Sequence, residues 1–107
     1  MPPEPNGGTD VGQHIESFVA DCRNQAEAGV AESQYDLGIL YSTGKGLPLD
    51  YVAAHQWFNL AALRGVSEAR DLRAELSTQM TKDDVAEALR RARAWLAAHA
   101  TPANVAA

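Results

Sequence analysis

The fold is decided by residues 28–65, which read AGVAESQYDLGILYSTGKGLPLDYVAAHQWFNLAALRG. Apolar residues recur at steps of three and four over residues 31–42, and this spacing predicts an amphipathic helix. Two glycines and a proline then interrupt the pattern within residues 43–48, as is typical of a loop. The stretch therefore opens with a helix and a compact turn.

A second helix is predicted over residues 51–64. The carboxylate of Asp50 can accept the free amide protons of its first turn and meets the positive end of the helix dipole. Residues 57–63 are apolar nearly all the way round, so we expect this helix to lie between neighbours. Gly65 can take the left-handed conformation that ends it.

A preceding helix is predicted by a stripe at helical spacing, with an N-cap at Thr9 or Asp10 and an end before Gly29. The stripe consists of Val11, Ile15, Phe18, Val19, Cys22 and Ala26. Two further helices are predicted after residue 65. One opens at Ser67 or Glu68, and the other begins at Thr81, where Asp84 three residues later resembles a capping box.

These five antiparallel helices predict an all-α fold, a short α-solenoid of the α-α superhelix type. The chain has 107 residues, which suits one domain with one core. No stretch alternates apolar and polar residues long enough for a strand, so no sheet is expected. We expect a single domain at 10–99 and disordered tails rich in small residues at 1–9 and 100–107.

The charge of −5 is uneven along the chain, because residues 1–60 hold eight acidic and two basic side chains. An acidic chain without a basic stripe is a poor candidate for nucleic acid. The cluster Arg90, Arg91 and Arg93 lies among acidic residues, and Glu87 reaches Arg91 at i,i+4. We interpret this cluster as a solvated, ion-paired face.

Cys22 is the only cysteine, which excludes an intrachain disulfide and favours a small core residue. The first ten residues contain neither a basic start nor an apolar run, and no window approaches the length of a membrane span. No membrane contact and a cytoplasmic location are therefore expected.

Residues 28–65 resemble one unit of the Sel-one-like repeat family, a relative of the tetratricopeptide repeat. After it, residues 65–69 echo 29–33 at an offset of 36 residues (65 minus 29). This second unit lacks the Leu-Gly-x-x-Tyr motif and the Gly-x-Gly loop, so the last two helices are interpreted as a terminal cap. The residues that carry the resemblance are Ala28-Gly29, Ser33-Gln34, Leu37-Gly38, Tyr41, Gly44, Gly46, Leu47-Pro48, Asp50, Ala54, Trp57, Ala61-Ala62 and Gly65.

The matching positions also have a physical interpretation as scaffold. Gly38 is expected where a neighbouring helix comes close, with alanines opposite it, while Leu37, Tyr41 and Trp57 fill the remaining space. The Gly-x-Gly at Gly44 is not a phosphate loop, because such a loop follows a strand.

Side chains for chemistry are few. His14, His55 and His99 are far apart in sequence and lack zinc-site spacing, so no metal and no cofactor are expected. His55 is interpreted as a buried, hydrogen-bonded histidine and Cys22 as an inert thiol. Adjacent acids at Asp83 and Asp84 suit a helix start better than acid/base catalysis. The chain is predicted not to be an enzyme.

The resemblance implies a module that binds a peptide or protein partner on the concave face of the repeat, as an adaptor does. It points Glu32, Tyr35, Asp36 and Ile39 inward, and these four are the predicted contact residues, suited to a partner with a basic and an apolar element. Two alternatives stay open. The chain can be a self-assembling homodimer, or a small regulatory protein that blocks a target enzyme.

Overall fold

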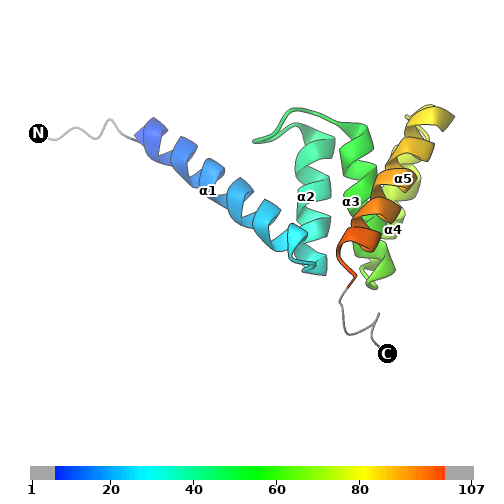
Figure 1. Ribbon diagram of the computed structural model, residues 1–107. Helices are drawn as coiled ribbons and strands as arrows, with labels where there is room; N and C mark the ends of the chain where they lie inside the picture. The colour runs from blue at the N-terminus through cyan, green and yellow to red at the C-terminus, as the bar shows by residue number, and fades with distance from the viewer. Residues whose placement is uncertain (1–6, 101–107) are drawn as a thin grey trace, which may run out of the picture.

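The computed structural model describes residues 7–100 and contains five helices with no strand among them (Figure 1). This confirms the all-α prediction. The expected tails fall mostly outside the described residues, so the domain limits stay a prediction. The helices are α1 (Gly7–Glu27), α2 (Ala31–Thr43), α3 (Tyr51–Leu63), α4 (Ser67–Ser77) and α5 (Lys82–Ala98).

One boundary differs from the prediction. The helix α1 begins at Gly7, so Thr9 and Asp10 lie inside it and neither is its N-cap. Gly7 and Gly8 continue the helical backbone ahead of them, and the first turn therefore starts before the two residues that sequence preference favours as caps.

The pair α2 and α3 is packed most closely at Gly38. A Cβ atom built on this glycine would lie only 2.5 Å from Cε1 of Phe58, whose side chain is buried. Only a residue without a side chain lets the two helices approach this far. Gly38 therefore occupies a helix contact, as predicted, but the side chain nearest to it is the Phe58 ring and not one of the alanines that were expected opposite it.

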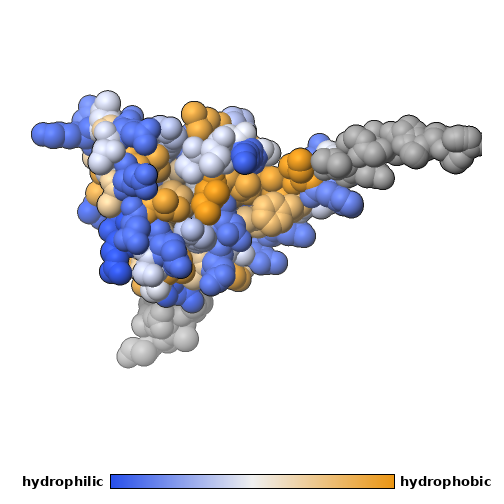
Figure 2. Space-filling model, turned by 180° about the vertical axis from the view of Figure 1, so that it is seen from behind, coloured by the Kyte–Doolittle hydropathy of each residue, from blue (hydrophilic) through white to orange (hydrophobic). Residues whose placement is uncertain are grey.

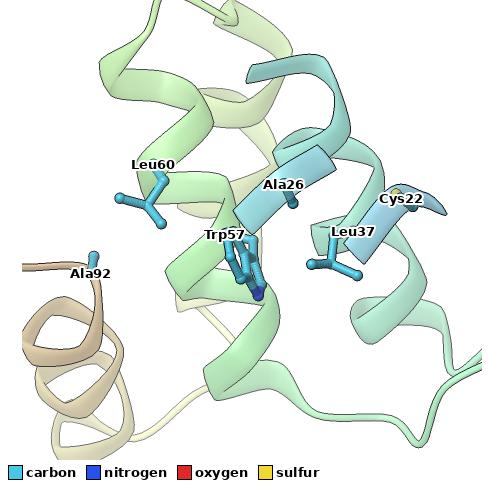
Figure 3. Packing of buried hydrophobic residues seen from close by; sticks show 6 residues of the cluster. All are labelled: Cys22, Ala26, Leu37, Trp57, Leu60 and Ala92. Atoms are coloured by element: carbon cyan, nitrogen blue, oxygen red, sulfur yellow. The ribbon is translucent and has the colours of Figure 1, made fainter. Parts of the chain in front are cut away.

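Helix α3 is the centre of the molecule, because it packs against α2, α4 and α5. One of its faces joins a cluster that reaches from α1 to α5 (Figure 3). Residues 57–63, which are apolar nearly all the way round the helix, thus lie between neighbouring helices, as expected, although the last of them, Leu63, is 66% exposed. The buried members of the cluster are Cys22, Ala26, Leu37, Trp57, Leu60 and Ala92.

The opposite face of α3 forms a second apolar cluster with α4. Phe58 lies at its middle, and the side chains of Tyr35 and Ile39 on α2 pack against it. Its buried members are Ala54, Phe58, Ala61, Ala69 and Leu76. The two clusters fix α3 from both sides, and α2 and α4 lie over the same part of its surface.

The helix ends follow local sequence preferences. The side chain of Asp50 accepts a hydrogen bond from the backbone N–H of Ala53 at 3.0 Å, and Thr81 does the same for Asp84 at 3.0 Å. Gly44 ends α2 with φ +72°. The predicted caps at Asp50 and Thr81 and the first loop glycine are therefore confirmed.

Helix α1 leans away from the other four helices toward its N-terminal end (Figure 1). The loop after α2 reaches back to it, and Gly46 lies against the side chains of Val19 and Ile15. Ile15 and Phe18 are nevertheless 47% and 53% exposed. Two residues of the apolar stripe of α1 thus stay largely uncovered by the rest of the described chain, and apolar surface extends along α1 in Figure 2.

Candidate binding surface

The four predicted contact residues lie on one face of α2, because each is three or four residues away from two of the others. Glu32 is exposed, while Tyr35, Asp36 and Ile39 are half-buried. Tyr35 and Ile39 lean toward the α3–α4 cluster, and the Tyr35 ring lies 6.1 Å from that of Phe58. The face therefore has an apolar edge beside α4 and an acidic edge formed by Glu32 and Asp36.

The acidic edge borders an open groove of about 250 Å³ between α1 and α2. The groove combines an exposed aromatic ring, a buried thiol and two carboxylates, and none of its lining residues is basic. It is lined by Phe18, Asp21, Cys22, Gln25, Ser33 and Asp36. Of these, only Asp36 was predicted as a contact residue.

The floor of this groove is held by polar contacts. The Cys22 thiol donates to the backbone oxygen of Ser33 at 3.4 Å, and the Ser33 hydroxyl donates to Oε1 of Gln25 at 2.8 Å. Nearby, Nε2 of Gln34 donates to the backbone oxygen of Ala26 at 3.2 Å. Side-chain hydrogen bonds thus hold α1 against α2 at the groove.

The groove disfavours additional negative charge. Burial, and then the neighbouring carboxylate of Glu32, raise the pKa of Asp36 above its usual range. Burial, and then Asp36, raise the pKa of the Cys22 thiol to about 11. The thiol is therefore protonated and inert near neutral pH, as predicted, and Asp36 would gain from a positive neighbour.

A second, smaller groove of about 160 Å³ lies on the other side of α2, between it and α4. The sequence analysis did not predict it, since its walls come from three helices. Its lining residues are Ser42, Tyr51, Phe58, Leu72, Glu75, Leu76 and Gln79. The predicted contact face of α2 thus lies between two grooves, an acidic one beside α1 and a smaller one beside α4.

His55 is a buried structural histidine, as predicted. Its Nε2 lies 2.8 Å from the Ser77 hydroxyl and its Nδ1 lies 3.2 Å from Nδ2 of Asn59. Arg73 donates to Oδ1 of Asn59 at 2.6 Å. Burial, and then the charge of Arg73, lower the pKa of His55, so the ring is neutral near pH 7 and links α3 to α4.

The described part of the chain holds no candidate metal site. No three His, Cys, Asp or Glu side chains gather there as ligands for a metal ion. None of the described helices is long and apolar enough to cross a bilayer. In the arginine cluster, Glu87 pairs with both Arg90 and Arg91, and these hydrogen bonds lower the pKa of Glu87. The predicted ion-paired face is therefore confirmed for these two arginines.

The antiparallel pair α2–α3, with partial units before and after it, defines a helical repeat protein. Residues 31–66 match the family model of the Sel1 repeat, and this range begins with α2 and ends just after α3. The chain therefore carries one clear Sel1 repeat, as the sequence predicted. Such repeats generally serve as protein–protein interaction modules. None of the curated proteins matches the chain.

Proposed function

We propose that this protein is a non-enzymatic adaptor that holds a peptide or protein partner on the predicted concave face of α2, formed by Glu32, Tyr35, Asp36 and Ile39. The acidic edge of that face carries the proposal: Glu32 is exposed, Asp36 is held beside it, and the pKa of Asp36 is raised by burial and then by this proximity. A basic element of a partner would relieve this repulsion. An apolar element would cover the exposed parts of Tyr35 and Ile39.

Affinity capture of the intact chain from its own host, followed by mass spectrometry, would identify the partner. The double variant Glu32→Lys with Asp36→Lys should lose that partner, because both acids become repulsive. A matched variant, Glu68→Lys with Asp71→Lys, changes the same charges on the exposed surface of α4 and should keep it. Equal capture by the two variants would contradict the assignment of this face.

Replacing Tyr35 and Asp36 together with Ala tests the apolar edge. Capture should be lost while the helical circular dichroism is unchanged. Since Tyr35 packs near Phe58, a thermal melt of this variant is needed alongside. Tyr35→Phe with Asp36→Asn keeps the ring and removes only the hydroxyl and the charge, which separates a loss of contact from a loss of stability.

A homodimer is the second candidate, and one observation favours it. Leu63 and Leu96 are 66% and 43% exposed and border the same small pocket on α3 and α5. At the base of this pocket Oε1 of Gln34 is buried without a hydrogen-bond partner. A second copy could cover this patch. A monomeric mass by light scattering at high concentration, unchanged by Leu63→Glu, would exclude the dimer.

A further inference from the structure

The groove between α1 and α2 lies where a complete repeat array would hold a helix. The internal offset of 36 residues, which relates Gly65 to Gly29, also relates α3 to α1 and α4 to α2. Five of the six residues that line the groove then correspond to members of the apolar cluster between α3 and α4. In order, Phe18, Cys22, Gln25, Ser33 and Asp36 correspond to Ala54, Phe58, Ala61, Ala69 and Leu72.

The corresponding surface on α3 and α4 is filled, and the helix that fills it is α2. Tyr35 and Ile39 of α2 pack against that cluster, and Ser42 of α2 lines the same small groove as Leu72. The structure thus shows how a helix sits on this kind of surface. Between α1 and α2 the equivalent surface is open, and Phe18 is 53% exposed there.

The open surface differs from the filled one in polarity. Ser33 stands where α4 has Ala69, and Asp36 stands where α4 has Leu72. Asp21 adds a second carboxylate to the lining. A purely apolar helix would leave Asp36 desolvated without a partner, which is costly. Since Ser42 lines the same groove as Leu72, a cationic side chain at the equivalent place would neutralise Asp36.

We propose that the α1–α2 groove binds an amphipathic helix of a partner protein, which takes there the position that α2 holds on α3 and α4. Its apolar side chains cover Phe18, and an Arg or Lys pairs with Asp36 and Asp21. The proposal rests on the proposed function and names the partner class. A second copy of the chain fits less well, because the chain carries a net charge of −5 and the groove is itself acidic.

The chain supplies its own probe. A peptide of residues 31–43 carries the apolar side chains of α2, and Ser42→Arg places a cation where the proposal requires it. A hydrocarbon staple in place of Glu32 and Asp36 removes the acids and holds the helix, which would otherwise be marginal at this length. By fluorescence anisotropy this peptide should bind the intact protein at least about tenfold more tightly than the matching Ser42→Glu peptide.

Variants of the protein locate the binding. Asp36→Arg should reverse the preference, so that the Ser42→Glu peptide becomes the tighter ligand, and Phe18→Ala should weaken both peptides. Asp71→Arg makes the same charge change on the exposed surface of α4 and should leave the preference intact. Absence of binding to the unmodified protein, or an equal response to Asp36→Arg and Asp71→Arg, would overturn the proposal.

The groove and the broader adaptor function can fail separately. Phe18 lines the groove but does not belong to the predicted face of α2, whereas Ile39 belongs to the face but does not line the groove. A native partner lost on Phe18→Ala supports the groove. A partner kept by Phe18→Ala and lost on Ile39→Lys would overturn the groove and leave the adaptor function standing.

Discussion

The pairs α2–α3 and α1–α2 are both antiparallel helix pairs, yet they are held together differently. The α2–α3 pair is held by close steric packing, in which the Phe58 ring occupies the space that a side chain at Gly38 would need. The α1–α2 pair combines the packing of Cys22 and Ala26 with side-chain hydrogen bonds, and it leaves Ile15 and Phe18 exposed. Stability is thus concentrated in the complete repeat, and exposed apolar surface is left where the array is incomplete.

The largest difference between the pairs should appear at two helical glycines. At Gly38→Ala the new Cβ would collide with the buried Phe58 ring, whereas at Gly12→Ala it would meet nothing within 4 Å. We expect Gly38→Ala to lower the free energy of unfolding by about 1–2 kcal/mol net of the better helix propensity. Gly12→Ala should raise it by up to about 1 kcal/mol.

Urea unfolding followed by circular dichroism measures both values. Phe58→Leu replaces the ring with a smaller side chain. It should lower the free energy of unfolding less in the Gly38→Ala background than in the unmodified protein. Equal effects of Ala at the two glycines would show that α2–α3 is packed no more tightly than α1.

The second prediction concerns the polar link between α3 and α4, beside the tight pair. His55→Ala would leave Ser77 and Asn59 without this partner and should cost about 1–3 kcal/mol of stability. The loss of His55 should also change the pH dependence of the free energy of unfolding. Because the folded-state pKa of His55 is lowered, the unfolded chain binds the proton more readily, so stability is full above the ordinary histidine pKa and falls as pH decreases below it.

Thermal melts between about pH 7.5 and pH 5 would show this decrease. The decrease should be smaller in His55→Gln, which keeps a hydrogen-bonding side chain but does not titrate. His14→Gln, an exposed histidine on α1, is the matched control and should leave the pH dependence unchanged. An identical pH response in all three proteins would contradict the role of His55.

The third prediction compares the starts of α3 and α2. Asp50 caps α3 through the Ala53 amide, whereas Val30 starts α2 without a side-chain cap. Asp50→Ala should cost about 1 kcal/mol, and Val30→Ser, at an extended and 44% exposed residue, should gain about as much. Denaturant midpoints measured on both variants test the pair. A loss on Val30→Ser would mean that its apolar contacts outweigh a cap.

The fourth prediction concerns the Cys22 thiol, which lies between α1 and α2. With a pKa of about 11, Cys22 should react with a disulfide reagent at mildly alkaline pH on the order of a hundredfold more slowly than a free cysteine. We expect its residual reaction to proceed through local opening of α1, and therefore faster than global unfolding allows. A rate equal to that of global unfolding would show that α1 is held as firmly as α3.

The helices and their ends were predictable because their signals are local. The cap at Asp50, the glycine at Gly44 and the apolar run of α3 each act within one or two turns of backbone. The start of α1 was not predicted correctly, because the preference of Thr9 and Asp10 for a capping position is weaker than the tendency of a helix to extend through adjacent residues. The partner of Gly38 could not be named, because the ring of Phe58 comes from 20 residues further along the chain (58 minus 38).

The candidate site was predicted only in part. Helical spacing placed Glu32, Tyr35, Asp36 and Ile39 on one face, but it could not tell that Tyr35 and Ile39 lean on the α4 side while Asp36 borders α1. Phe18 was missed because an apolar residue on a stripe predicts burial. The internal offset was visible in the sequence and could have indicated Phe18 once the filled surface on α3 and α4 was known.

The sequence by itself determined the five helices, the caps at Asp50 and Thr81 and the Sel1 repeat, because helix propensity, capping and the repeat pattern are properties of neighbouring residues. Only the tertiary structure decided which apolar residues are covered. Burial depends on how many helices surround a position: α3 has neighbours on both sides, while the N-terminal half of α1 reaches beyond α2. The open groove follows from that geometry, and the sequence of α1 alone does not contain it.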